Sequence, residues 1–280
     1  MLISVHKKII LLLILIMGVL SANQNMKIIS LAPGYTYQLY KLNRGNSLIA
    51  NTIYCNTPTP AREKTRVGSI VNVDVEKIYT LQPDLVISST LTRRNQIEKL
   101  KNLGLRVKIF HRPGSFQGII NQYQQLGELV GREALAKSQL DSINQNITYI
   151  QSKLKDREKR SIFFQIGTNP LYAANESSFI NDLIEMANCQ NIVKTTNSGS
   201  FSREKIIAKN PEIIFIALNG DKNLHEKQIW QKYKSLRAVK KDQIYPVNPD
   251  IFCTPTPFTF SRALEKMVNM LYPDLNLNNE

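Results

Sequence analysis

One phrase occurs twice in the chain, and this repeat constrains the possible fold more than any other feature. Residues 75–89 read VEKIYTLQPDLVISS, and residues 203–217 read REKIIAKNPEIIFIA. In each copy a short amphipathic segment precedes a proline, which ends a helix because it cannot continue the hydrogen-bond ladder. The branched apolar run that follows is typical of a strand buried on both faces. The repeat therefore predicts two halves, each with a helix packed on a buried parallel strand.

Strands and helices are expected to alternate around both copies, which is the pattern of a parallel α/β lobe. The segments NPLYAA and IFCTPTPFTF are interpreted as loops, and the last helix is expected over residues 261–271. The predicted strands are residues 27–31, 48–53, 85–88 and 106–110 in the first half, and 161–167, 213–217 and 244–247 in the second.

A long segment between the two halves lacks proline, from residue 116 to residue 160. About 22 of its residues would form a rod of roughly 33 Å. Its position between two similar halves favours a helix that spans two lobes, although an ordinary amphipathic helix within one domain is the alternative. The apolar residues that form one helical stripe, at spacings of 3 and 4, are Leu140, Ile143, Ile147, Ile150 and Leu154.

The predicted fold class is therefore α/β, with two lobes of mainly parallel sheets joined by one long interdomain helix. The predicted domains are a signal peptide (1–22), an N-terminal lobe (23–115), a helical linker that includes the interdomain helix (116–160) and a C-terminal lobe (161–280).

The first residues have the features of a signal peptide. Lys7 and Lys8 precede an apolar run, residues 9–20, and the small residues Ser21 and Ala22 follow. The run is shorter than the about 20 residues of a membrane span, although an uncleaved anchor is the alternative. We expect export to the periplasm with cleavage near Ala22, and no lipid anchor, because no cysteine follows the run.

The net charge of +14 is carried by basic residues spread along the chain. Export and this even spread argue against a nucleic-acid partner. A solvated basic surface, or a field that favours anionic ligands or membranes, remains as the explanation.

Catalytic motifs are absent from the sequence. It contains no GxSxG, HExxH, GxGxxG or phosphate-loop pattern, and after the predicted signal peptide only His111 and His225 remain. A histidine-based triad or a three-histidine metal site is therefore poorly supported. We predict no enzymatic activity and no cofactor of the protein's own.

Ligands of open α/β sheets bind beyond the carboxyl ends of the strands. Here those ends read YCN, SSTLTRR, HRPG, GTNPLY and NPDIFC. Arg93 and Arg94 lie in one of them and could bind carboxylates or phenolates of an anionic chelate. The alternative for each is a solvated surface arginine.

Several phrases, in their order and spacing, carry a resemblance to a known family: KIISLAP, VEKIYTLQPDLVI, LGLRVKIF, LGELVGREALA, SREKIIAKNPEIIFIA and SLRAVKKDQIYPVN. The chain resembles the periplasmic solute-binding proteins of ABC importers whose lobes are joined by one long helix. These serve cobalamin, ferric siderophores and haem. The resemblance implies a monomer that captures a metal-containing chelate in the cleft between its lobes. It implies delivery to a permease driven by an ATPase subunit.

The cobalamin-binding members are the nearest in this resemblance. In them a glutamate of each lobe docks onto arginines of the permease, and the matching residues are Glu76 and Glu204. The alternative is that both acids only face the positive end of a helix. Two other function classes stay open: a secreted metal-dependent enzyme on the same scaffold, and a sensory binding module without transport.

The resemblance also implies ligand-binding residues. Tyr54, Tyr172 and Asp250 match two cleft aromatics and a cleft aspartate, whereas Ile70 and Ser89 stand where those members carry tryptophans. The arginine that follows the aspartate in those members falls on Thr254, and the single tryptophan, Trp230, belongs to a helix expected outside the cleft. The ligand therefore stays open among corrinoids, ferric siderophores and haem.

Two cysteines suggest a different ligand. Cys55 and Cys253 each follow a predicted strand, one in each lobe. A pair of thiolates suits a soft or borderline metal, so a bare transition-metal ion held by both is an alternative. Two ordinary buried cysteines, or a disulfide between them, are the other interpretations. The disulfide of cobalamin binders is expected to be absent, because Cys189 matches one half and the last helix offers no second cysteine.

Overall fold

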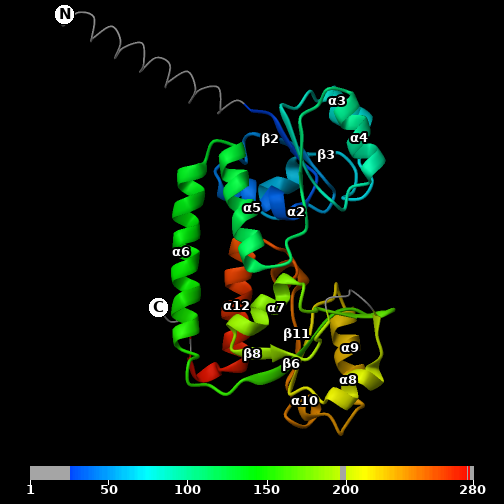
Figure 1. The fold of residues 1–280 in the computed structure, drawn as a ribbon. Coiled ribbons are helices and arrows are strands. Elements are labelled where there is room, and N and C mark those ends of the chain that lie inside the picture. Colours follow the sequence, from blue (N-terminus) through cyan, green and yellow to red (C-terminus); the bar gives the residue numbers. More distant parts are fainter. Residues whose placement is uncertain (1–25, 196–199, 276, 278–280) are drawn as a thin grey trace, which may run out of the picture. The chain divides into compact units, whose positions relative to one another are not determined.

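The structure, a computed structural model, describes residues 26–195, 200–275 and 277. These residues divide into two units, of which the first ends at Arg112 and also includes residues 124–136 (Figure 1). The second unit comprises residues 113–123 and the chain from Lys137 onward. The predicted signal peptide and its cleavage site lie outside the described residues. No helix within the described ranges has the length and apolar character of a membrane span.

The first unit is built on a five-stranded sheet in the order β3-β2-β1-β4-β5, with all neighbours parallel. Its core side chains include Ile29, Leu31 and Val86, which have no exposed surface. The strands are β1 (Ile28–Ser30), β2 (Leu48–Asn51), β3 (Thr65–Arg66), β4 (Leu85–Ser89) and β5 (Val107–Phe110), and the helices are α2 (Pro33–Lys41), α3 (Val75–Thr80), α4 (Arg94–Asn102) and the 3-10 helix η1 (Thr59–Glu63).

The second unit contains a six-stranded sheet in the order β11-β10-β6-β7-β9, with β8 also paired to β6. β11, β10, β6 and β8 are parallel, whereas β7 and β9 are antiparallel to their neighbours. Its strands are β6 (Arg160–Gly167), β7 (Leu171–Ala173), β8 (Cys189–Asn191), β9 (Ser200–Phe201), β10 (Ile213–Ile216) and β11 (Ile244–Pro246). Its helices are α7 (Phe179–Met186), α8 (Arg203–Lys209), α9 (Lys222–Gln231), α10 (Arg237–Lys240), α11 (Pro249–Phe252), α12 (Pro257–Leu271) and the 3-10 helix η2 (Pro273–Leu275).

Both copies of the repeated phrase fold in the same way at their start. The Asp74 side chain caps α3 by accepting a hydrogen bond from the Lys77 N–H, and the Ser202 side chain caps α8 by accepting one from the Lys205 N–H. Such caps satisfy backbone donors that the first turn leaves without partners.

The two copies also share their buried face and their end. Ile78 and Ile206 occupy the same place in each phrase, and both are buried in the core of their unit. Gln82 and Asn210, each directly before a proline, both have φ of +46°. A left-handed residue there ends the helix, and the buried strands β4 and β10 follow. The predicted pairing of a helix with a buried parallel strand in each half is confirmed.

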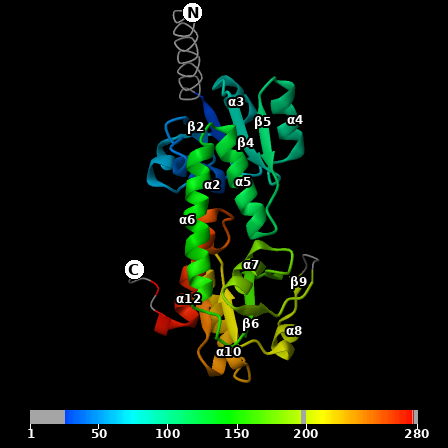
Figure 2. The same ribbon diagram turned by 60° about the vertical axis from the view of Figure 1, so that its left-hand side comes forward.

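The proline-free segment forms two helices, α5 (Phe116–Leu129) and α6 (Glu133–Ser152), and α6 is the long unbroken green helix in Figure 2. Each of the two contributes residues to both units, because residues 124–136 belong to the first. Arg44 holds their connection to the first unit by donating from Nε to the Val130 carbonyl at 2.8 Å. All five residues of the predicted helical stripe are buried, at 9% exposure or less.

Two segments predicted as loops contain regular elements, and one strand was missed in the same half. The segment NPLYAA contains strand β7, whose partners β6 and β9 lie elsewhere in the sequence. Strand β8 follows α7 and was not predicted, and part of the expected loop IFCTPTPFTF folds as α11.

The last helix also begins earlier than predicted, at Pro257. Thr256 and Thr259 form a capping box, in which each side chain accepts a hydrogen bond from the backbone N–H of the other. Proline at the first helical position costs no hydrogen bond, since that N–H has no partner within a helix.

We expect the variant T256A to lower the free energy of unfolding by about 1 kcal/mol, because it removes the acceptor that caps α12. Urea denaturation followed by circular dichroism measures the loss. The matched control is T148A, in the exposed middle of α6, where the Thr148 hydroxyl only donates to the Asn144 carbonyl. That variant should change stability by less than about 0.5 kcal/mol. Equal losses in the two variants would contradict the capping role.

Candidate functional site

Large apolar side chains are exposed where the strands of the first unit end. Ile53 and Tyr54 follow β2, Val71 follows β3 and Leu91 follows β4, with exposures of 50%, 56%, 45% and 57%. Because these strands are parallel, their carboxyl ends meet at the same edge of the sheet. We call these four residues the apolar rim. Exposed apolar side chains gathered at one edge are typical of a surface that binds a ligand.

The loop that carries Tyr54 is fixed by Arg66. The guanidinium donates from Nη1 to Asn51 Oδ1 at 2.5 Å and to the Thr52 carbonyl at 2.6 Å. The same nitrogen donates to the Cys55 carbonyl at 3.2 Å. These bonds hold the loop from within, so Tyr54 is presented on a supported backbone, which favours a defined binding surface.

Ile70, another predicted ligand residue, is half-buried in the loop between β3 and α3. Its carbonyl accepts a hydrogen bond from the Thr92 hydroxyl at 2.8 Å, and that hydroxyl accepts one from Ser88 at 3.0 Å. Thr92 follows β4, so this buried chain of bonds ties the loop after β3 to the loop after β4. In the sequence Ile70 directly precedes Val71, which is a member of the apolar rim.

The two predicted chelate-binding arginines are exposed at the start of α4. Arg94 forms an ion pair with Glu98 at 2.8 Å, with 92% of the arginine side chain exposed. Exposed pairs of this kind contribute little to stability. The Arg93 backbone N–H donates to the Val71 carbonyl at 3.2 Å, and the Arg93 side chain is exposed to solvent. Their role in binding a chelate stays a prediction.

Cys55 does not lie on the surface. Its side chain is fully buried, the Thr36 hydroxyl donates to Sγ at 3.2 Å, and the Thr52 hydroxyl lies 3.2 Å from the same sulfur. This burial agrees with the alternative of an ordinary buried cysteine, and the role of Cys55 as a ligand or metal residue stays a prediction. A cysteine at a strand end packs here as a small apolar residue.

In the second unit Tyr172 is an exposed aromatic in the strand that follows β6. It lies on β7 with 43% exposure, and its ring covers Gly167 at the end of β6. A Cβ atom at Gly167 would come within 3.0 Å of the Tyr172 ring, so glycine is needed for this close packing. The contact supports one face of the ring, so the exposed part of the side chain is held in place.

Asp250 and Cys253 lie at the two ends of the short helix α11, which follows β11. Asp250 is exposed, and its backbone N–H donates to the Asn248 side chain that caps the helix. Cys253 is half-buried at the C-terminal end of the helix. Both remain predicted ligand residues, Asp250 within the helix and Cys253 as the residue that directly follows it.

The described residues contain no disulfide and no group of three or more His, Cys, Asp or Glu side chains that could hold a metal ion. Cys189, the third cysteine, is buried in the second unit, and burial raises the pKa of its thiol to about 11. The pair predicted to hold a bare metal ion is Cys55 and Cys253. Because Cys55 is enclosed, these two residues are not presented as a pair of exposed thiols.

Thiol reactivity tests this arrangement. At pH 8, we expect iodoacetamide to modify Cys253 first in the native protein. Cys55 is enclosed, and the raised pKa of Cys189 leaves almost none of the reactive thiolate at this pH. Mass spectrometry of peptides would locate the label, with protein in urea as the control in which all three react. Rapid labelling of Cys55 in the native protein would show that its burial is wrong.

The two docking residues predicted from the resemblance occupy equivalent places. Glu76 and Glu204 are each the second residue of their capped helix, and both are exposed. Hydrogen bonds from its own backbone N–H and from Ser202 lower the pKa of Glu204, so it is ionised at neutral pH. Each unit thus presents one carboxylate at the start of a helix.

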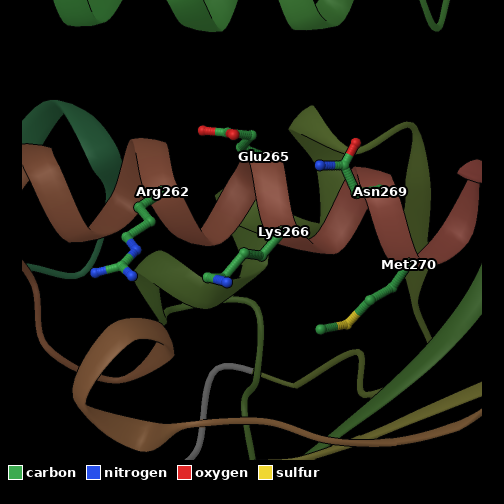
Figure 3. Close-up of a pocket in the computed structure, with 5 residues that line it drawn as sticks. All are labelled: Arg262, Glu265, Lys266, Asn269 and Met270. Carbon is green, nitrogen blue, oxygen red and sulfur yellow. The ribbon is translucent and has the colours of Figure 1, made fainter. Parts of the chain in front are cut away.

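We consider two pockets among the described residues of the second unit, and none of the predicted ligand residues lines either of them. A pocket of about 410 Å³ lies along α7 and β8, and a pocket of about 550 Å³ lies along α12. Figure 3 shows that the side chains lining the larger pocket all project from this one helix. Their charges are mixed, so we place the candidate site at the strand ends instead. The residues along α12 are Arg262, Glu265, Lys266, Asn269 and Met270.

The sequence analysis missed three members of the apolar rim: Ile53, Val71 and Leu91. The signal that could have found them is a large apolar residue in the loop after a strand, two positions from the strand end for Ile53 and Leu91 and five for Val71. Such a position is usually solvated, so a large apolar side chain there indicates a contact outside the unit's own core.

Comparison with known proteins adds to this geometry. The profile of the family described as periplasmic binding protein matches residues 28–251. The chain is 28% identical over 258 residues to the uncharacterized ABC transporter substrate-binding lipoprotein YvrC of Bacillus subtilis, covering 89% of this chain and 80% of the relative.

It is 26% identical over 243 residues to the vitamin B12-binding protein of Vibrio parahaemolyticus, covering 85% of this chain and 87% of the relative. The crystal structure of the periplasmic haem-binding protein HutB of Vibrio cholerae is similar with a TM-score of 0.77 and 17% identity, over 89% of this chain and 100% of that one. This last likeness establishes a shared fold.

Proposed function

This chain belongs to the periplasmic binding protein family, and from that premise we propose that it is the extracytoplasmic solute-binding protein of an ABC importer. The relatives named above support this proposal, since one is a substrate-binding protein of an ABC transporter and another binds vitamin B12. In this role the protein captures its solute outside the cytoplasmic membrane and acts as a monomer.

The proposed ligand is a metal-containing chelate: a corrinoid first, with haem and ferric siderophores as the other members of the class. The observation that carries this proposal is the apolar rim with Tyr54, matched by the exposed Tyr172 of the second unit. Aromatic and aliphatic surfaces suit a large ligand with extended apolar faces. Asp250, Arg93 and Arg94 would then contact the polar groups at its periphery.

Delivery is the second part of the proposal. Glu76 and Glu204, one on each unit, would pair with basic residues of the permease, and the ATPase subunits would drive transport. Complementary charges at an interface fix the orientation of the partners and raise the rate of encounter. Both acids lie in the first turn of a capped helix, α3 or α8, so in this proposal docking and ligand binding use different residues.

Binding without catalysis is the third part. The family and the named relatives are binding proteins, which supports a chain that neither transforms its ligand nor carries a cofactor of its own. The scarcity of histidine points the same way, because acid–base chemistry at neutral pH most often uses that side chain.

Ligand identification tests the proposal. The protein would be purified from its host, and the absorption spectrum and metal content of the co-purifying solute would be recorded. Titrations of ligand-free protein with cyanocobalamin, haemin and a ferric catecholate should then show one tight binder, with a Kd of about 1 μM or lower. Failure to bind all three, or tight binding of a bare metal ion alone, would overturn it.

A further inference from the structure

The two copies of the repeated phrase differ at the first position of their helices. Val75 begins α3 and packs as an apolar residue against the core of the first unit. Arg203 begins α8 at the same position in the second unit. A charged residue therefore stands where the other copy has an apolar packing residue, directly before the proposed docking acid.

Arg203 belongs to a buried polar network. Its Nη2 lies 2.6 Å from Glu226 Oε2 on α9, and its guanidinium lies over the Trp230 ring at 4.6 Å from the centroid. Gln165 of β6 donates from Nε2 to the same carboxylate oxygen at 2.9 Å, and it accepts from Trp230 Nε1 at 2.7 Å. Four side chains from β6, α8 and α9 thus satisfy one another.

This network is deeply enclosed. Glu226 is 4% exposed, and neither Gln165 nor Trp230 has any exposed surface. A buried carboxylate is unfavourable unless it is paired and hydrogen-bonded, so Glu226 depends on Arg203 and Gln165. The Arg203 Nη1 atom is buried and has no hydrogen-bond partner among the described residues, so the ion pair and the ring contact decide where the guanidinium lies.

The network reaches the two functional regions of the second unit. At one end Gln165 also donates to the Gly167 carbonyl at 3.1 Å, and Gly167 lies under the Tyr172 ring. At the other end Arg203 immediately precedes Glu204 in the first turn of α8. At its start that turn is held by the Ser202 cap and by the bond of the Arg203 side chain to Glu226.

We propose that Arg203 and Glu226 are positioning residues for the Glu204 carboxylate. The ion pair anchors the first turn of α8 to α9 and β6, and so sets the direction in which Glu204 meets the permease. This inference rests on the proposed docking function of Glu204. Glu76 needs no such anchor, because Val75 packs the equivalent turn by apolar contact alone.

A double-mutant cycle tests the inference. The association of the purified protein with its permease and ATPase subunits in lipid nanodiscs would be measured for E204Q, E226Q and E204Q/E226Q. We expect each single variant to weaken association by about tenfold and the double variant by about tenfold as well, because both changes remove the same contact. The variant E76Q/E226Q should lose about a hundredfold, because the two units contribute independently.

A second variant excludes a folding defect. E226Q leaves the partly buried Arg203 without its ion-pair partner. R203V/E226Q removes both charges and places at position 203 the valine that the first copy carries at position 75. This variant should melt cooperatively and weaken association by the same factor as E226Q. The positioning role would be overturned if R203V/E226Q associated with the permease like wild type. It would also be overturned if the losses of affinity in E204Q and E226Q multiplied in E204Q/E226Q.

A local measurement separates this inference from the proposed function. Trp230 is the only tryptophan in the chain, so its fluorescence reports the network directly. In R203V/E226Q we expect a shifted emission maximum and faster amide exchange in the first turn of α8, with the exchange of β10 unchanged. If these changes occur but E204Q does not affect association, the proposed docking role of Glu204 is wrong, whereas the anchoring of α8 by Arg203 and Glu226 is supported. If neither exchange nor emission changes, the anchor itself is wrong.

Discussion

The variant E76K/E204K should abolish import while its affinity for the ligand stays within about twofold of wild type. Each substitution replaces an exposed carboxylate at a capped helix start with a cation. Against basic residues of a permease, this change turns attraction into repulsion, and the two units contribute two such contacts. We expect uptake by cells to fall by more than about a hundredfold, which is a large effect for two surface residues.

A matched control for this variant is E133K. Glu133 is also an exposed acid in the first turn of a helix, α6, so its reversal makes the same unfavourable change at a helix start. Uptake by E133K should remain close to wild type. The docking role is excluded if E76K/E204K loses ligand affinity in proportion to uptake, or if E133K is equally defective.

The variant Y54A/Y172A should weaken ligand binding by about a hundredfold, with about tenfold from each residue. Both residues are about half exposed, Tyr54 in the loop after β2 and Tyr172 in the short strand β7 of the other unit. Removing a ring takes away a large apolar contact that an aliphatic neighbour does not replace. Because the residues belong to different units, their effects should add in free energy.

Titration with the chelate identified by co-purification measures this loss. The control is Y79A, because Tyr79 is also 50% exposed but lies on α3 instead of at a strand end. Its ligand affinity should be unchanged. If Y54A and Y172A bind like wild type, the strand ends of the two units are not the ligand site, whatever the result for the docking acids.

The repeat explains why much of the fold was predictable. The signals for each copy lie within sixteen residues: a capping side chain, a buried isoleucine, a proline and a branched apolar run. Their effects are local, because a cap acts three residues ahead and a proline acts on its own turn. The long helix was predictable for a similar reason, since its apolar stripe repeats at helical spacing.

The candidate site was less accessible from the sequence. Tyr54, Tyr172 and Asp250 came from a resemblance, and the structure places the two tyrosines and the aspartate exposed at strand ends of the two units. The other members of the apolar rim, Ile53, Val71 and Leu91, were missed because they are ordinary residues whose exposure depends on how the loops fold. The sequence left open whether Cys55 is buried, and in the structure Thr36 and Thr52 enclose its side chain although it lies in a loop.

The sequence by itself determined the two halves, the helix starts at Asp74 and Ser202 and the buried strands, because these depend on residues close together in the chain. Only the tertiary structure decided the antiparallel strands β7 and β9, the burial of Cys55 and the pairing of Arg203 with Glu226. Those features join residues up to tens of positions apart. Whether such residues meet is set by the packing of the whole unit, and side-chain patterns along the chain carry no direct signal of it.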